Sequence, residues 1–404
     1  MRGGIGLAAA VTAVTAVLGA GCGTASLAGG GHSRASRAPS PAVTGTMVAP
    51  AGGAGGIDAI ATLSESDAWG VGSHTPLPKG TYPLTEHWDG KRWTAVPCPS
   101  PGSPAEPVRS YLEAAAMDAP DDAWAVGYWS PIEHAAPVYS LIEHWNRAKW
   151  SIVPAPHSPG HTTGGLSAVA AISPTAAWAF EGGGVMRWDG TRWRYLPSPP
   201  RTGLGTDLTG MAVISAHDIW VIGTRLLPHT VATFRTLAEH WDGSKWTIVP
   251  TPNAFKDRTR NSVLSAVSGS SSGNVWAVGW YQSGAGVSDY STLVEHWDGT
   301  RWQVQPSPDG PRAAGDSQLF AVAALSRTSA WAAGTNEGPV PLIERWDGVR
   351  WTAMPSRLWS HLSAADLYQV VAVDPRYAWA LGWFDHLIEK WNGTSWRQVR
   401  YPVP

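Results

Sequence analysis

Four times in this sequence a glutamate and a histidine stand directly before a tryptophan, and these two residue types can transfer protons or bind a metal ion. Each pair precedes a tryptophan and ends a short segment typical of a β-strand, in which neighbouring side chains point to opposite faces. The two members of a pair therefore cannot act on one substrate atom. A pair that recurs also argues against a single active site, so we predict a structural role. The four pairs are Glu86-His87, Glu143-His144, Glu239-His240 and Glu295-His296.

Polar and aromatic residues that do not recur are better candidates for a binding site. They fall in connecting segments whose lengths differ along the chain, and variable loops on a rigid scaffold commonly carry function. Exposed aromatic side chains suit a carbohydrate or a protein partner. The predicted binding residues are Trp129, Glu133, His134, Arg258, Arg260, Trp280, Asp289, Tyr290, Trp359, His361 and Trp383.

A glycan-acting enzyme, a hydrolase or lyase, is the alternative interpretation of the same segments. Glycosidases need two carboxyl groups roughly 5–10 Å apart, so two unrepeated acids would have to converge. We predict neither a metal site nor a cofactor, because His157 and His161 lie four residues apart without a cysteine or carboxylate nearby. The candidate acids are Glu106, Glu133, Asp207, Asp289, Asp316 and Asp366.

The elements that position these residues are set by a repeat of three tryptophans. Each of seven units has one Trp and then a Trp pair spaced five residues apart, and a self-similarity of about 50 residues fixes an architecture. Only Trp129, Trp280, Trp359 and Trp383, of 25 Trp, lie outside the pattern. The first Trp of each unit is Trp69, Trp124, Trp178, Trp220, Trp276, Trp331 and Trp379, and the pairs are 88/93, 145/150, 188/193, 241/246, 297/302, 346/351 and 391/396.

Each unit contains four short segments typical of strands, separated by turn residues, which predicts a four-stranded antiparallel meander. A single sheet of this kind cannot bury its faces, whereas seven arranged radially can, as in a β-propeller. We predict an all-β chain with a seven-bladed β-propeller over residues 57–404. The blades are expected at about 57–100, 109–157, 165–199, 207–252, 262–308, 317–356 and 363–404.

The third and fourth segments of most units are joined by Asp-Gly, a strong signal for a two-residue type I′ hairpin. With Asp89-Gly90 as such a loop, Glu86 lies opposite Trp93. This register predicts that the Glu86 carboxylate accepts a hydrogen bond from the Trp93 indole N–H.

The first 22 residues have the features of an export signal. Arg2 precedes an apolar run from Ile5 to Leu18, which is short of the roughly 20 residues needed to span a membrane. The segment Leu-Gly-Ala-Gly-Cys at 18–22 resembles a bacterial lipobox, which implies lipidation at Cys22. Cleavage after a small residue without lipidation is the alternative.

Residues 23–56 consist mostly of Gly, Ala, Ser, Pro and Thr, which cannot bury a core, so we predict a disordered tether that contributes no strand. Blade 1 and blade 7 are then each built from their own unit, without an overlap of the two termini. The other cysteine, Cys98, is expected to be an unpaired packing residue.

Resemblances to known repeats agree with a propeller. Trp-Asp at 88–89, 188–189, 241–242, 297–298 and 346–347 resembles the end of a WD40 repeat, without its companion Gly-His. Asp-Gly-x-x-Trp is similar to the Asp-box turn of sialidase-type propellers, with Asp and Gly adjacent here, and a kelch-like Gly doublet occurs at Gly182-Gly183-Gly184. Residues 57–404 resemble the Trp-rich propeller repeats of exported bacterial envelope proteins. That resemblance implies the fold and leaves function open.

The two faces of such a disc should differ. The turns between strands one and two and between three and four lie on one face and are short in this chain. The connections on the opposite face, which we call the loop face, are long and variable: the first and second Trp of successive units are 19, 21, 10, 21, 21, 15 and 12 residues apart. We therefore predict a site on the loop face near the central channel.

Together with the export signal, these features predict a binding or scaffold module on the outer face of the cytoplasmic membrane, anchored through Cys22, or alternatively a secreted protein. The partner is expected to be a protein or carbohydrate of the cell envelope, and the chain a monomer that meets the membrane only through its lipid. A formal net charge of −2 leaves no basic footprint for nucleic acid.

Overall fold

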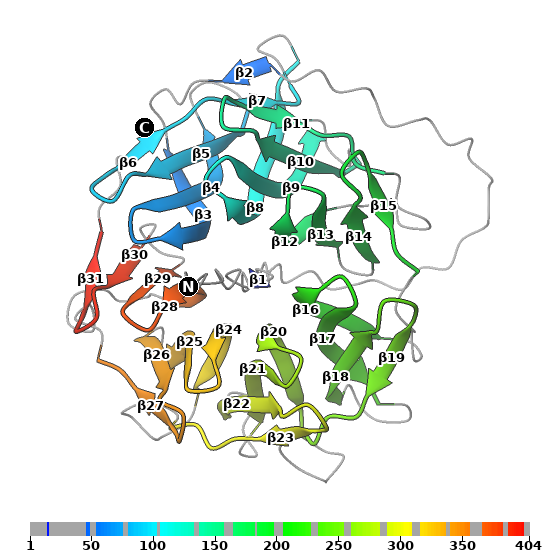
Figure 1. The fold of residues 1–404 in the computed structure, drawn as a ribbon, viewed down its shortest axis with the longest axis vertical. Helices are drawn as coiled ribbons and strands as arrows, with labels where there is room; N and C mark the ends of the chain where they lie inside the picture. Colours follow the sequence, from blue (N-terminus) through cyan, green and yellow to red (C-terminus); the bar gives the residue numbers. More distant parts are fainter. Residues whose placement is uncertain are drawn as a thin grey trace, which may run out of the picture.

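The computed structural model arranges the chain as a ring of small antiparallel sheets around a central axis (Figure 1). Each blade has four strands in chain order, which confirms the predicted all-β, seven-bladed β-propeller. The part of the chain that the structure describes contains no helix, and hence none with the length and hydropathy of a membrane span. The described residues are 14–15, 46–48, 54–75, 80–102, 106–132, 137–156, 165–181, 184–197, 205–227, 233–253, 260–282, 289–308, 316–336, 340–355, 366–382 and 387–399.

The blades follow one another around the ring, each with its first strand nearest the axis and its fourth at the rim (Figure 1). Blades 1 to 4 consist of β3 (Ala54–Ser64), β4 (Asp67–Thr75), β5 (Tyr82–Trp88) and β6 (Trp93–Ala95); β8 (Val108–Ala119), β9 (Asp122–Pro131), β10 (Tyr139–Trp145) and β11 (Trp150–Ile152); β12 (Leu166–Ser173), β13 (Ala176–Glu181), β14 (Gly184–Trp188) and β15 (Trp193–Tyr195); and β16 (Thr206–Ser215), β17 (Asp218–Leu226), β18 (Phe234–Trp241) and β19 (Trp246–Val249). Blades 5 to 7 consist of β20 (Ser262–Ser271), β21 (Asn274–Gln282), β22 (Tyr290–Trp297) and β23 (Trp302–Val304); β24 (Gln318–Ser326), β25 (Ser329–Asn336), β26 (Val340–Trp346) and β27 (Trp351–Ala353); and β28 (Leu367–Asp374), β29 (Tyr377–Gly382), β30 (Leu387–Trp391) and β31 (Trp396–Gln398).

Three short strands lie outside this scheme. β1 (Val14–Thr15) pairs with β16 and β20 and joins blades 4 and 5 into one nine-stranded sheet. β2 (Thr46–Val48) pairs with β7 (Cys98–Ser100). The prediction that the 23–56 segment contributes no strand is wrong, since β2 lies within it and β3 begins at its end. Small residues suit this close pairing, because a Cβ at Gly55 would collide with His74 of β4.

The hairpins between third and fourth strands differ from the predicted type. Trp88 pairs directly with Trp93, and Glu86 pairs with Ala95, so four residues form the loop. The predicted hydrogen bond between Glu86 and Trp93 is also wrong, because neither carboxylate oxygen nor the indole N–H has a hydrogen-bond partner.

The aspartate of the Asp-Gly sequence explains the longer loop. Asp89 Oδ1 accepts the backbone N–H groups of Lys91 and Arg92 at 2.9 Å each, and Gly90 has a φ of +93°. A short polar side chain that caps its own turn competes with a two-residue hairpin. The same turn is held by Asn146, Asp189, Asp242, Asp298, Asp347 and Asn392.

The repeated tryptophans pack at the junctions between blades. In the junction of blades 1 and 2, the ring of Trp69 lies 4.8 Å from that of Trp145 and 4.9 Å from that of Trp150. At the closing junction, Trp379 of blade 7 lies 5.3 and 5.5 Å from the corresponding pair of blade 1. All seven first tryptophans are at most 2% exposed, so they hold neighbouring blades together rather than face a ligand.

The ring closes without a blade shared between the two ends of the propeller. Gln369 Oε1 of blade 7 accepts the backbone N–H of Ile60 in blade 1 at 2.7 Å. The Tyr368 hydroxyl donates to the Ile57 carbonyl at 3.3 Å. Side-chain hydrogen bonds and the aromatic junction thus take the place of a strand contributed by the other terminus.

The first strand of every blade contains a β-bulge at the same place. In blade 1, Ile57 pairs with Gly72 and Ala59 with Val71, so Asp58 is the extra residue. In blade 1 the residue opposite the bulge is a glycine, because a Cβ at Gly72 would collide with the backbone carbonyl of Gly56, whereas blade 3 has Glu181 at this position. The seven bulged residues are Asp58, Glu113, Ser167, Thr209, Ser265, Phe320 and Tyr368.

Candidate binding site on the inner strands of blades 1 and 2

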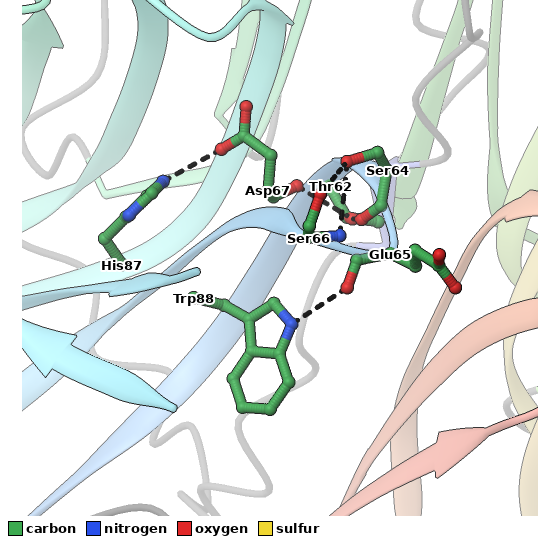
Figure 2. A network of polar contacts seen from close by, with 7 residues as sticks. All are labelled: Thr62, Ser64, Glu65, Ser66, Asp67, His87 and Trp88. Carbon is green, nitrogen blue, oxygen red and sulfur yellow. Dashed lines mark hydrogen bonds and ion pairs between the residues drawn. The ribbon is translucent and has the colours of Figure 1, made fainter. Parts of the chain in front are cut away.

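The histidines of the Glu-His pairs belong to a repeated network, which Figure 2 shows in blade 1, where His87 contacts Asp67. His87 Nε2 lies 2.8 Å from Asp67 Oδ1, and its ring lies 4.9 Å from that of Trp69. Glu86 is fully buried on the opposite face of the strand. This repetition supports the predicted structural role. The same contact, at 2.8 Å in each case, joins His144 to Asp122, His240 to Asp218 and His296 to Asn274.

Blades 3, 6 and 7 place a cation where the other blades have this histidine. Such a charge is attracted to the face of an indole ring. The position therefore belongs to the scaffold whichever residue fills it. The charged groups of Arg187, Arg345 and Lys390 lie 5.7, 5.2 and 5.4 Å from the rings of Trp178, Trp331 and Trp379.

The bulged residue of the first strand differs in chemical type from blade to blade. Two of the seven bulged residues, Asp58 and Glu113, are acids, and they lie in adjacent blades. Burial, followed by the charge of Glu113, raises the pKa of Asp58 to about 8. Burial also raises the pKa of Glu113. Because two interacting carboxyl groups in such surroundings resist ionising together, the pair holds a proton at neutral pH.

Two stacked tyrosines accompany these acids. The rings of Tyr111 in β8 and Tyr128 in β9 lie 5.0 Å apart at 29°. Burial, and then the charges of Glu113, Tyr111 and Asp58, raise the pKa of Tyr128 to about 12. Because Glu113 raises the pKa of Asp58, and Glu113, Tyr111 and Asp58 raise that of Tyr128, these four residues form one unit, which we call the acid–tyrosine cluster.

The cluster lies toward the loop face. Tyr111 is near the start of β8 and Tyr128 near the end of β9, where the chain enters and leaves through loop-face connections. Beside it, the Thr81 N–H donates to the Val108 carbonyl at 3.0 Å, and the Thr81 carbonyl accepts the Ser110 N–H at 2.9 Å. Blade 1 is thereby joined to the inner strand of blade 2 in the region where loop lengths predict a site.

In two other blades the bulged side chain bonds to the backbone of the next blade. Thr209 Oγ1 donates to the carbonyl of Leu264 in the next blade at 2.7 Å, and Tyr368 makes the corresponding bond to Ile57. A carboxyl group can take over such a donor role only while it is protonated. The acids at this position in blades 1 and 2 can therefore donate a hydrogen bond to the protein when protonated, and can bind a ligand when ionised.

The structure brings two of the predicted binding residues together. Trp280 and Tyr290 are half-buried, with their rings 4.5 Å apart, at the loop-face end of blade 5. Asp289 adjoins them in the chain and is also half-buried. The Arg260 backbone carbonyl accepts a hydrogen bond from Arg235 Nη1 at 3.2 Å.

Trp129 is not the exposed aromatic that was expected. It is 8% exposed, stacks on Tyr139 at 4.6 Å and packs in the core between blades 1 and 2. The remaining predicted residues, with the lipidation site, lie outside the described residues: Glu133, His134, Arg258, Trp359, His361, Trp383 and Cys22.

The acids proposed for a glycan-acting enzyme do not include the pair that the structure brings together. Burial alone raises the pKa of Asp207, with no neighbouring carboxylate among the causes. The lengths of the loops do not indicate Asp58 and Glu113, because both residues lie within strands. One signal was available: the residue after the first-strand Ile or Leu differs in chemistry from unit to unit.

Cys98 is buried, as expected for a packing residue. It is 1% exposed, and its thiol donates to the Pro83 carbonyl at 3.4 Å. Among the described residues, no three His, Cys, Asp or Glu side chains gather in a way that could hold a metal ion.

No protein-family model and no curated protein matches the chain. Solved propellers are similar in fold. They include the propeller domain of the Trilobed protease from Pyrococcus furiosus, described as having an open velcro topology (TM-score 0.54, 10% identity, 87% of this chain and 99% of that one). YCF48 from Cyanidioschyzon merolae is similar over 86% and 98% of the two chains (TM-score 0.52, 14% identity). YCF48 bound to a D1 peptide is similar over 86% of this chain and 96% of its own (TM-score 0.51, 14% identity).

A GH74 xyloglucanase from Xanthomonas campestris is similar over 88% of this chain and 55% of its own (TM-score 0.51, 16% identity). This chain thus spans about half of that enzyme. At such identities the likeness shows the propeller fold alone.

Proposed function

We propose that the protein is a binding module whose ligand contacts the acid–tyrosine cluster from the loop face. One observation carries the proposal. All seven blades share the same bulge, yet only blades 1 and 2 place carboxyl groups there, and stacked tyrosines lie beside them. Paired aromatic rings with adjacent carboxyl groups can stack on and hydrogen-bond to a ligand at once.

A protein or glycan of the cell envelope is the proposed partner. The tyrosine faces suit a sugar ring or a peptide side chain, and the half-buried Trp280–Tyr290 pair offers a second aromatic contact on blade 5. A YCF48 propeller bound to a D1 peptide supports the idea that a ring of this kind can present a peptide site. Export by the N-terminal signal and anchoring through Cys22 are part of the same proposal, with secretion as the alternative.

A direct test uses the purified full-length chain on a glycan array and in pull-down from envelope extracts. The variant Asp58→Asn/Tyr128→Ala should lose at least tenfold in affinity for any ligand found. The control Ser265→Ala changes the bulged residue of blade 5 and should bind as the parent does. Equal binding by the cluster variant, or binding of neither class of partner by the parent, would reject the proposal.

Glycan hydrolysis is a second candidate, favoured by the effect of the neighbouring Glu113 on the pKa of Asp58. Neighbouring carboxyl groups with raised pKa values are the machinery of general acid catalysis. The full-length chain would then release reducing ends from a soluble polysaccharide, and Glu113→Gln would abolish the release. If the parent protein binds a glycan without cleaving it, the hydrolase hypothesis is rejected and the binding function is kept.

A further inference from the structure

Six of the seven blades bury a glutamate at the same position of the third strand. Each has no exposed surface at all, which is rare for a residue that is charged in water at neutral pH. Blade 3 has Met186 there, paired with Tyr195 as Glu86 is paired with Ala95. The six are Glu86, Glu143, Glu239, Glu295, Glu344 and Glu389.

These side chains point into the junction with the preceding blade. Ser307, at the end of blade 5, donates to both carboxylate oxygens of Glu344 in blade 6, at 2.9 and 2.8 Å. Cys98, at the end of blade 1, lies near enough to Glu143 of blade 2 for that carboxyl group to raise the thiol pKa, after burial. The glutamates therefore sit between blades, beside the tryptophan pairs.

Most of these carboxyl groups have no compensating partner. Both oxygens of Glu86, Glu143 and Glu239 are buried without a hydrogen bond. Burying an ionised carboxylate without a partner is prohibitively unfavourable, and the group takes up a proton instead. Burial accordingly raises the pKa of Glu86 and Glu239 to about 7 and that of Glu143 well above its usual value. For Glu295, burial, partly offset by the backbone of Asn253, raises it to about 8.

Charged groups nearby do not neutralise these acids. Each junction also contains the residue that stacks on the first tryptophan of the preceding blade, and none of these forms an ion pair with the glutamate among the described residues. The titratable groups at the tryptophans of these junctions are Lys390 and Tyr377 in the junction of Glu86, Cys98 and His87 in that of Glu143, Arg187 in that of Glu239, His240 in that of Glu295, His296 in that of Glu344 and Arg345 in that of Glu389.

We propose that the junction glutamates are incorporated as neutral acids and make the ring an acid-stabilised assembly, tightest at mildly acidic pH and looser at alkaline pH. The sign follows from their burial. Below about pH 4.5 both the folded and the unfolded chain hold these protons, and stability is fully present. As pH rises toward 7–8, only the unfolded chain releases them, so folding becomes progressively less favourable.

The junction of blades 2 and 3 provides an internal control for the third-strand position, because Met186 replaces the glutamate there while the tryptophans remain; the buried acid of the second strand, Glu181, accepts a hydrogen bond from the Tyr195 hydroxyl at 2.8 Å. Trp124 still lies 5.1 Å from both members of the pair Trp188 and Trp193. A methionine therefore fits this position in the chain's own architecture. Replacing a junction glutamate by methionine should preserve packing and delete only the proton.

The test is denaturant unfolding of the full-length chain between pH 5 and pH 8. We expect Glu143→Met and Glu239→Met each to weaken the dependence of the unfolding equilibrium constant on pH. Each acid that is removed should reduce the increase in this constant by about a factor of ten per pH unit. Glu239→Gln, which keeps shape and hydrogen-bonding capacity, should weaken the dependence equally. Met186→Glu should strengthen it by the same amount.

Hydrogen–deuterium exchange of the parent protein keeps the inference testable if a variant does not fold. After correction for intrinsic rates, exchange in β10 and β18 should increase with pH, while β14 beside Met186 should respond less. Profiles that stay parallel in all variants, or an equal pH response of β14 and β18, would overturn the proposal.

Discussion

The junctions between the blades and the inner strands vary in opposite ways. At the junctions, tryptophan occupies the same three positions in every blade, and every first tryptophan is buried against the pair of its neighbour. At the axis, the same backbone bulge recurs while its residue ranges from acid to hydroxyl to aromatic. Positions that keep the same residue in every blade thus belong to the scaffold. The bulge, where the backbone is the same but the side chain differs from blade to blade, is where a ligand can be recognised.

The largest effect should come from the junctions between blades. Trp276→Ala removes a side chain that is 1% exposed and contacts Trp346 and Trp351 across the junction of blades 5 and 6. Loss of this burial should lower the free energy of unfolding by about 3–5 kcal/mol. Chemical denaturation measures it, with Val349→Ala, at an 83% exposed site, as a control expected to change little. Similar losses in both variants would remove the distinction.

A smaller effect should come from the backbone that supports the bulge. In Gly127→Ala, the new Cβ would collide with the Tyr111 carbonyl and force the inner strands apart. We expect a loss of roughly 1–3 kcal/mol in unfolding free energy. Gly210→Ala is the matched control, since its Cβ would meet Ile222 at 3.4 Å, an ordinary contact. Tolerance of both substitutions would show that the bulge is not geometrically fixed.

The closing junction should respond to loss of its bridging side chain. Gln369→Leu leaves the buried N–H of Ile60 without its 2.7 Å acceptor. An unsatisfied buried donor costs about 1–3 kcal/mol, and the effect should appear first as faster amide exchange in β3 and β28. Ser268→Ala, which removes a similar acceptor for Ala324 inside the ring at 3.0 Å, is the comparison. Equal local exchange in the two variants would mean that closure has no special weak point.

The smallest expected change is electrostatic. Glu113→Gln removes the charge that, after burial, raises the pKa of Asp58, so that pKa should fall below about 8. Carboxyl-carbon NMR over pH 4–9 reads it directly. Stability should change little. An unchanged Asp58 titration would show that the two acids do not form one cluster.

The fold was accessible from sequence because one residue type marked it. Trp69 and its six counterparts are large enough to require burial wherever they recur, so their spacing reports the blade directly. The hairpin register was not accessible from the same pattern, because Asp89 uses its side chain to close a four-residue turn. Strand formation by Thr46–Val48 was equally hidden, since it depends on backbone pairing with β7 rather than on apolar side chains.

The candidate site was accessible only as a region. Loop lengths pointed to the loop face near the axis, but Asp58 and Glu113 interact through the ring geometry of two blades, which no local spacing encodes. Trp129 misled for the opposite reason. An aromatic outside the repeat suggests a ligand contact, yet here it fills the space between two inner sheets.

The most direct measurement of the central claim pairs binding with unfolding in one experiment on the full-length chain. Asp58→Asn/Glu113→Gln should abolish capture of the envelope protein or arrayed glycan that the parent binds, while its unfolding midpoint at pH 7 stays equal or rises. Phe320→Leu, at the corresponding bulge of blade 6, should leave binding intact. A double variant that binds as the parent does would contradict the assignment of function to this divergent pair.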